Sequence, residues 1–443
     1  MSKKTILLII AAAAVLLYII SNITGPDPIS FGSQFKGEIV DVANCSNSNI
    51  KGVKLIADHS GSMKGYVDFA GLGAANNNII GTVSTFVNRV SQNFNPQKFD
   101  AVCGQKKYNR ANDFLSELIK NTAFTNGSSM VWDLINNGVQ YASDSTVAVI
   151  LSDMVLSYGS AAIKNSGDLE YNQHHLNGLE GMVITEMTTA KQKGLDVVVI
   201  QYLSDFNGKY YYNCQENFVS LSPQRKTNHY IDVKMEKRPY YIMLIGSEDN
   251  LKAIVDKECY GTCASMYASF VTESPALRSG VEYTVKANNE NIWRVGNAPD
   301  KDGGFYSAFV PNESSSFEIS CEGVSLPRYY YKDEYSFVAE CKGPARGTKG
   351  RFANNEVSAT VTTDAVNTLN KGEGKIVADI YAVNKWVTES NAPVSDVDVL
   401  NALEGKTWGL EAFFNGINSV YYPSGNSYRA KIGSITINYY VNE

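Results

Sequence analysis

A short loop near residue 58 carries three oxygen-bearing side chains at alternating positions. Asp58, Ser60 and Ser62 lie in the run Asp58-His59-Ser60-Gly61-Ser62-Met63, directly after an apolar stretch. A hard dication such as Mg²⁺ takes about six oxygen ligands in near-octahedral geometry, and alternating side chains on one tight loop can all turn inward. Gly61 allows the backbone to fold between the two serines. The loop therefore predicts a site for Mg²⁺ or Mn²⁺.

The ligand types in this loop also predict what the ion would do. One carboxylate and two hydroxyls leave half of the charge of a dication uncompensated. A carboxylate from another molecule is then strongly attracted to the open position of the ion. We therefore expect the metal to capture a protein partner through one of its acidic side chains.

The elements that must position this loop are indicated by apolar periodicity. An apolar strand over residues 53–57 is followed by a helix over 79–94, whose apolar side chains recur at helical spacing. The alternation continues, which predicts an α/β fold over residues 50–265: a doubly wound, mostly parallel sheet with helices on both faces. In such sheets ligands bind beyond the carboxyl ends of the strands, where Asp58 lies. Further strands are expected at 98–103, 147–151, 197–203 and 240–245, and further helices at 114–119, 130–141, 179–191 and 251–255.

The strand followed by Asp58-x-Ser60-Gly61-Ser62-Met63 resembles the metal-ion-dependent adhesion site of von Willebrand factor type A domains. That family has an α/β sheet with helices on both faces. It binds Mg²⁺ through this loop, a Thr or Ser on a second loop and an Asp on a third. The resemblance covers about residues 50–265.

The resemblance implies two further ligands. Ser128, in a turn before a helix, matches the second loop, although Thr125 is close enough to be an alternative. Asp153 follows the apolar strand at 147–151 and matches the third loop. Met154 follows it where the family often has glycine. The implied metal ligands are Asp58, Ser60, Ser62, Ser128 and Asp153.

The sequence pattern changes twice after residue 204. Between 205 and 237 the alternation breaks into a Tyr- and Asn-rich stretch, which indicates an inserted hairpin or loop that could contact a partner. From residue 274 to 443 the apolar period becomes two, which favours an antiparallel, β-rich domain. One late helix, at 408–421, has an apolar stripe that we assign to core packing. The alternating strands are expected at 317–321, 357–361, 377–381 and 435–439.

The N-terminus predicts attachment to a membrane. Lys3 and Lys4 precede an uncharged, mostly apolar run over residues 5–20. This run is long for a signal-peptide core and close to the roughly 17 to 25 residues that span a bilayer. We expect a transmembrane signal anchor at 1–24 with a cytoplasmic N-terminus, then a linker at 25–49. The bulk of this single-pass protein would be periplasmic or extracellular.

Cysteines are permitted to pair in such a compartment. Seven are present, so at least one must be unpaired. Local bridges are expected, with Cys321 and Cys341 on adjacent strands as one plausible pair.

Composition and motifs exclude several other classes. The net charge of −6 provides no basic stripe for a nucleic acid. No G-x-S-x-G elbow is present, and Gly405-Lys406-Thr407 lacks the first glycine of a phosphate-binding loop. We therefore predict a binding protein that is not an enzyme. The alternatives are a structural subunit of an envelope complex and a metal-dependent hydrolase in which His59 or Asp68 assists a metal-bound water.

Overall fold

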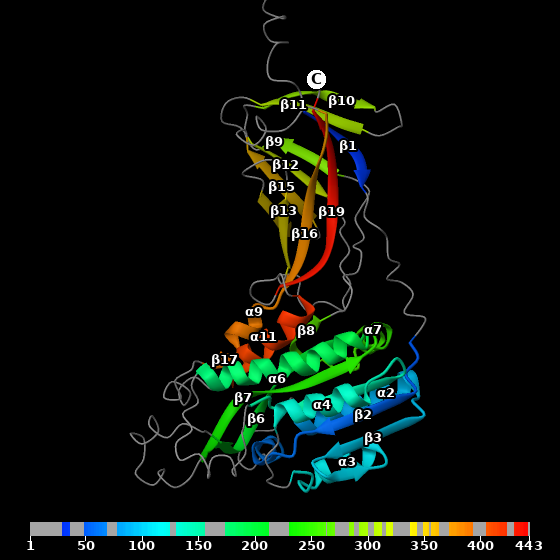
Figure 1. Cartoon of the computed structure of the whole chain (residues 1–443), viewed down its shortest axis with the longest axis vertical. Helices are drawn as coiled ribbons and strands as arrows, with labels where there is room; N and C mark the ends of the chain where they lie inside the picture. The colour runs from blue at the N-terminus through cyan, green and yellow to red at the C-terminus, as the bar shows by residue number, and fades with distance from the viewer. Residues whose placement is uncertain are drawn as a thin grey trace, which may run out of the picture.

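The chain forms an α/β unit and a β-rich unit (Figure 1). The predicted anchor at 1–24 lies outside the described residues, as do Thr125 and Ser128. Of the helices in the described part, none combines the length and apolar character needed to span a bilayer. The computed structural model describes residues 29–35, 48–68, 78–124, 130–155, 173–211, 230–262, 264–270, 283–287, 292–299, 305–311, 316–321, 337–342, 349–353, 356–362, 372–392, 405–422 and 429–441.

The α/β unit is built on a seven-stranded mixed sheet in the order β4-β3-β2-β5-β7-β6-β8. The first strand of this unit in chain order is β2, which pairs in parallel with β3 on one side and β5 on the other. The remaining pairings are antiparallel. The strands are β2 (Gly52–Ala57), β3 (Lys98–Cys103), β4 (Lys106–Tyr108), β5 (Thr146–Ser152), β6 (Asp196–Tyr211), β7 (Tyr230–Gly246) and β8 (Ala264–Phe270).

Strand order reverses at β2, since the chain goes first to β3 and later returns to β5 on the other side. The carboxyl ends of β2 and β5 therefore form the switch point at which open α/β sheets bind ligands. The predicted parallel arrangement holds for these central strands and fails at β7. The reason is that β7 forms a hairpin with β6, and a hairpin pairs its strands antiparallel.

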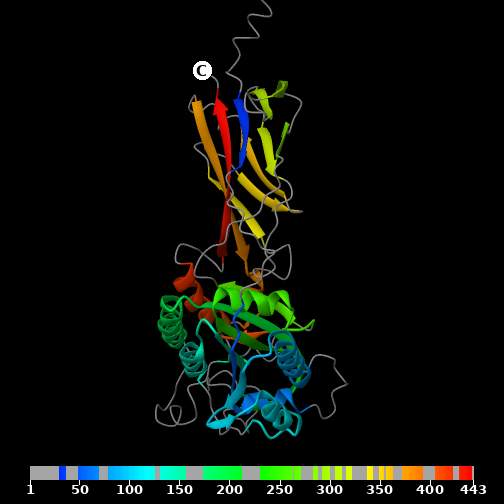
Figure 2. The ribbon, with the colours of Figure 1, turned by 90° about the vertical axis from the view of Figure 1, so that its right-hand side faces the viewer.

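Helices cover both faces of this sheet. Helices α4 and α6 contact each other on one side, and α2 lies on the other (Figure 2). The α2 helix has the bounds that its apolar period predicts, and its Asn78 side chain caps it by accepting a hydrogen bond from the Gly81 N–H. The helices of this unit are η1 (Gly61–Tyr66), α2 (Ile79–Phe94), α3 (Ala111–Ile119), α4 (Val131–Tyr141), α6 (Gln173–Gln192) and α7 (Glu248–Asp256).

The core of the unit lies on the central strands. Residues 147–151 of β5 are all apolar and have no exposed surface, as a strand covered on both faces requires. Burying each large apolar side chain contributes about 1.5–3 kcal/mol. This packing fixes the carboxyl end of β5, from which Ser152 and Asp153 project.

Strands β6 and β7 continue beyond the sheet as a two-stranded ribbon, which we call the arm: residues 204–211 and 230–239. It confirms the predicted insertion as a hairpin, paired as far as Tyr211 and Tyr230. The pairing is irregular between Ser204 and Phe206, close to Pro239 of β7. Proline is tolerated in a sheet at such bulges, which also redirect neighbouring side chains.

The arm packs closely on η1, the short helix that follows the Asp58 loop. A Cβ atom added at Gly208 would lie 2.6 Å from the Cα of Gly65, a distance that real Cβ atoms essentially never show. The Tyr66 ring meets the Phe206 ring edge-on at 4.9 Å. The two glycines therefore allow the arm and the loop region to touch backbone to backbone.

Gly208→Ala should accordingly destabilise the protein by about 1–3 kcal/mol, because the arm must move away from η1. Gly181→Ala is the matched control, since an added methyl at this exposed position of α6 meets nothing within 4 Å. The control should stabilise the helix by about 0.5–1 kcal/mol. Urea unfolding of both variants checks the pair, and equal effects would contradict the close packing.

The β-rich unit contains a six-stranded and a four-stranded sheet, and every pairing within them is antiparallel, as predicted. In chain order the strands of the first sheet are β1 (Ile29–Phe35), β10 (Ile292–Pro299), β11 (Phe305–Pro311), β13 (Phe337–Lys342), β16 (Gly372–Val383) and β19 (Arg429–Val441). The second sheet has β9 (Tyr283–Ala287), β12 (Ser316–Cys321), β14 (Lys349–Ala353) and β15 (Glu356–Thr362).

Two sequence-based expectations change in this unit. Strand β1 comes from the segment expected to be a linker. It lies between β11 and β19 and pairs with both. Cys321 lies in β12 and Cys341 in β13, which belong to different sheets, so the two cysteines are not on neighbouring strands. In the α/β unit, Cys103 and Cys259 are buried and unpaired.

Strands β16 and β19 pair from end to end, and the described residues between them pack on the α/β unit (Figure 2). We call this connecting segment the cap: residues 384–392 and 405–422. The late helix thus belongs to the interface with the α/β unit, where the Tyr421 hydroxyl donates to the Leu195 carbonyl and the Lys191 ammonium to the Val420 carbonyl. The cap contains α9 (Lys385–Glu389), β17 (Asn391–Ala392), β18 (Thr407–Trp408) and α11 (Leu410–Tyr421).

Candidate metal centre

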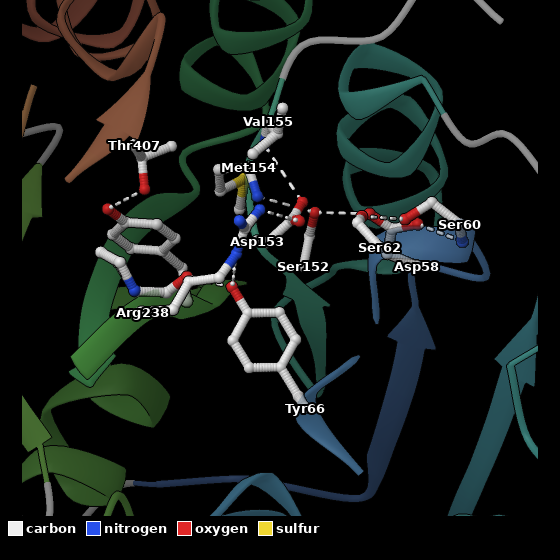
Figure 3. Close-up of polar contacts among 12 residues, drawn as sticks. Asp58, Ser60, Ser62, Tyr66, Ser152, Asp153, Met154, Val155, Arg238 and Thr407 are labelled. Carbon is white, nitrogen blue, oxygen red and sulfur yellow. Dashed lines mark hydrogen bonds and ion pairs between the residues drawn. The ribbon is translucent and has the colours of Figure 1, made fainter. Parts of the chain in front are cut away.

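Asp58 occupies the switch point between β2 and β5. Its backbone N–H donates to the Leu151 carbonyl of β5 at 2.8 Å, which continues the pairing one residue past the strand. Its side chain is buried, and each carboxylate oxygen accepts a hydrogen bond: Oδ1 from the Ser60 N–H at 2.7 Å and Oδ2 from the Ser152 hydroxyl at 2.8 Å (Figure 3). Hydrogen bonds to a charged acceptor are the stronger kind, so they hold the carboxylate in place.

The two loop serines are brought together beside Asp58. The hydroxyl oxygens of Ser60 and Ser62 lie 3.0 Å apart. Adjacent ligands of an octahedral Mg²⁺, each about 2.1 Å from the ion, are separated by roughly 3 Å. The spacing thus suits two neighbouring metal ligands, and it equally suits the hydrogen bond that joins the hydroxyls. The spacing is therefore compatible with both arrangements, and metal binding by the first loop stays a prediction.

The third-loop residue, Asp153, lies in a different arrangement from the one the resemblance implies. Its Oδ2 forms an ion pair with the Arg238 guanidinium, with 3.3 Å between Oδ2 and Nη2. Its Oδ1 accepts the Val155 N–H at 3.2 Å. The side chains of Arg238 and Asp153 are 4% and 2% exposed, so solvent does not screen the pair. The buried guanidinium balances the charge of the third-loop carboxylate.

Arg238 is held on several sides. Its Nε donates to the Tyr66 hydroxyl at 2.9 Å, and its guanidinium carbon lies 4.3 Å from the centre of the Phe206 ring. Burial raises the pKa of Tyr66 well above its ordinary value, although Arg238 partly opposes the shift. Tyr66 therefore stays protonated, and it donates to the Pro239 carbonyl while accepting from Arg238. These contacts fix the guanidinium beside Asp153.

A thiol also lies close to Asp58. Cys103, at the end of β3, lies near the Asp58 backbone carbonyl. Burial, and secondly the negative charge of Asp58, raises the pKa of its thiol to about 12. The thiol is thus protonated at neutral pH. Across the described ranges, no group of three or more His, Cys, Asp or Glu side chains could hold a metal.

The structure brings some of the predicted metal ligands together, and others lie outside the described residues. Asp58, Ser60 and Ser62 form one cluster, and Asp153 lies in the adjoining pair with Arg238 (Figure 3). Ser128 and its alternative Thr125 lie outside the described residues. The ring of His59 lies over Gly104, whose added Cβ would be 2.8 Å from the His59 Cγ.

Ser152, Arg238 and Tyr66 were missed from the sequence. Ser152 stands next to Asp153, and its hydroxyl also accepts the Met154 N–H at 3.0 Å. The only local signal for Arg238 is a charge placed directly before the fully apolar end of β7. Met154 has a φ of 54°, in the left-handed region that glycine adopts readily. This backbone agrees with the glycine that the resembling family often has there.

The fold and the site define an α/β protein with an oxygen-rich loop at the switch point of its sheet. No protein-family model matches the chain, and the comparisons with characterised proteins and with solved structures gave no significant match.

Proposed function

We propose that this protein is an adhesion-type binding protein, similar to von Willebrand factor type A domains, that captures a protein partner through a bound Mg²⁺ or Mn²⁺. Asp58, Ser60, Ser62 and a second-loop hydroxyl, that of Ser128, would hold the ion. The observation that carries the proposal is the pair of serine hydroxyls, 3.0 Å apart, beside a buried carboxylate at the switch point. Asp153 is treated separately, because its carboxylate is paired with Arg238.

Charge supports capture of an acidic group. Asp58 and Asp153 supply two negative charges, and Arg238 balances one of them. A dication beside these residues would leave about one positive charge in excess, which attracts a carboxylate strongly in a poorly solvated site. The partner carboxylate would complete the coordination of the ion.

The β-rich unit would act as a spacer in this proposal. The chain enters it at β1, and β1, β10 and β11 lie at the end distant from the α/β unit (Figures 1 and 2). A membrane anchor at 1–24 would precede this distant end. The metal centre would then be held away from the membrane, on its non-cytoplasmic side, where a partner can reach it.

A capture experiment with the detergent-solubilised full chain tests this function. The chain should bind MnCl₂ in a calorimetric titration, and in the presence of Mn²⁺ it should bind beads coated with poly-glutamate. Beads coated with poly-glutamine are the control. EDTA should release the protein from the acidic beads. Absence of Mn²⁺ uptake at millimolar concentration, or retention on the beads after EDTA, would argue against the proposal.

A structural subunit of an envelope complex is the second candidate. The observation that favours it is that both carboxylate oxygens of Asp58 already accept hydrogen bonds from within the chain. In this alternative the loop only stabilises the fold. A membrane complex of constant composition, recovered equally with and without EDTA, would support this candidate over metal-dependent capture.

A further inference from the structure

The buried arginine of the arm is a fixed positive charge next to the candidate metal centre. We propose that Arg238 is a positioning residue that keeps Asp153 out of the coordination sphere of the metal, so that tight metal binding requires the carboxylate of the partner. This inference rests on the proposed metal-dependent function. It assigns Asp153 to charge balance instead of direct ligation.

Contacts with two aromatic side chains hold Arg238 in place. The guanidinium stacks on Phe206 at 4.3 Å and donates to Tyr66 at 2.9 Å, and both rings belong to the packed contact between η1 and the arm. Arg238 pairs with Ser204 at the start of the irregular register, and from there its side chain reaches Asp153 of the third loop. The close approach of Gly65 and Gly208 holds the arm against η1. Withdrawal of Arg238 would therefore break its contacts with both rings.

The balance of charges then determines which side chains would bind the metal ion. A metal ion and the guanidinium would compete for a single carboxylate, and the guanidinium already lies 3.3 Å from it without solvent screening. Asp58 would then be the one carboxylate ligand that the described loops give to the ion. A dication with one carboxylate and several hydroxyls binds weakly by itself. A carboxylate from the partner would strengthen metal binding, and the metal would strengthen partner binding by the same factor.

Mn²⁺ binding to the full chain, followed by electron paramagnetic resonance, tests this role. The double variant Arg238→Gln/Asp153→Asn removes the pair without changing net charge. It should keep the wild-type Mn²⁺ affinity within about threefold, whereas loss of a carboxylate ligand of a hard cation should weaken binding by on the order of a hundredfold or more. Arg238→Gln alone frees the Asp153 carboxylate and should tighten Mn²⁺ binding by about tenfold.

A second buried pair provides the matched control. Lys54 and Asp100 form an ion pair at 2.8 Å between β2 and β3 of the same sheet. Lys54→Gln also removes one buried positive charge, and it should leave Mn²⁺ affinity within about threefold of wild type. Tightening by Arg238→Gln and not by Lys54→Gln would locate the effect at the metal centre.

Glutarate serves as the acidic probe for the coupling. It should raise the Mn²⁺ affinity of the wild-type chain, and raise it less in Arg238→Gln, where Asp153 supplies the second carboxylate.

If Arg238→Gln does not fold, the Mn²⁺ affinity of the double variant alone tests whether Asp153 is a ligand. A loss of on the order of a hundredfold or more in the double variant would overturn the inference, while Mn²⁺ binding by the wild-type chain would still support the proposed function. If the wild-type chain binds no Mn²⁺, the proposed function itself fails.

Discussion

Asp58→Asn is expected to weaken Mn²⁺ binding by on the order of a hundredfold or more, because it removes the carboxylate ligand of a hard cation. The fold should survive the change. The asparagine oxygen can still accept the Ser60 N–H, and its amide can donate to the Ser152 hydroxyl oxygen. Calorimetric titration of the purified full chain with MnCl₂ measures the loss, and thermal unfolding without metal checks that the variant is folded.

Asp113→Asn is the matched control for Asp58→Asn. Asp113 is a half-exposed carboxylate on α3, paired with Arg110. Its replacement should leave Mn²⁺ affinity unchanged. If Asp58→Asn binds Mn²⁺ as tightly as the control, the D-x-S-x-S loop is not the metal site, and the resemblance to an adhesion site carries no function.

The second large effect is expected on stability. Arg238→Met should lower the free energy of unfolding by about 3–5 kcal/mol, because it leaves the buried Asp153 carboxylate without the charge that balances it. Adding Asp153→Asn should recover a large part of the loss, since the double variant no longer buries an uncompensated charge. Urea unfolding of both single variants and the double variant gives the coupling energy of the pair.

An exposed ion pair provides the comparison for this cycle. Arg110 and Asp113 are 2.9 Å apart and largely solvent-exposed. Arg110→Met should change the unfolding free energy little, because solvent screens such pairs. Additive effects of Arg238→Met and Asp153→Asn would contradict the idea that the two residues act as one buried unit.

The arm and the cap meet next to this buried pair. The Gly405 N–H of the cap donates to the Lys237 carbonyl at 2.9 Å, one residue before Arg238. Two residues past Pro239, the Tyr241 hydroxyl donates to the Thr407 hydroxyl at 3.0 Å. Because the cap connects β16 to β19, the β-rich unit contacts the strand that carries Arg238. The two units are thus joined near the candidate site as well as through the chain connections.

The sequence by itself determined most of the local structure. Helix α2 and strand β3 have the predicted bounds, and β2, β5 and α4 differ from prediction by one residue at one or both ends. The reason is that apolar period and length specify a helix or a buried strand from nearby residues alone. The Asp58 loop was recognised in the same way, since three oxygen-bearing side chains within five residues form a local pattern.

Only the tertiary structure determined which of these helices and strands lie next to one another. The placement of β7 between β5 and β6, the pairing of β1 in the β-rich unit and the packing of α11 on the α/β unit depend on contacts between distant parts of the chain. Asp153 and Arg238 are 85 positions apart, and no local period relates them. The charge environment of the candidate site therefore arises only when the arm folds against the Asp58 loop, because a buried charge is balanced by whatever the folded chain places beside it.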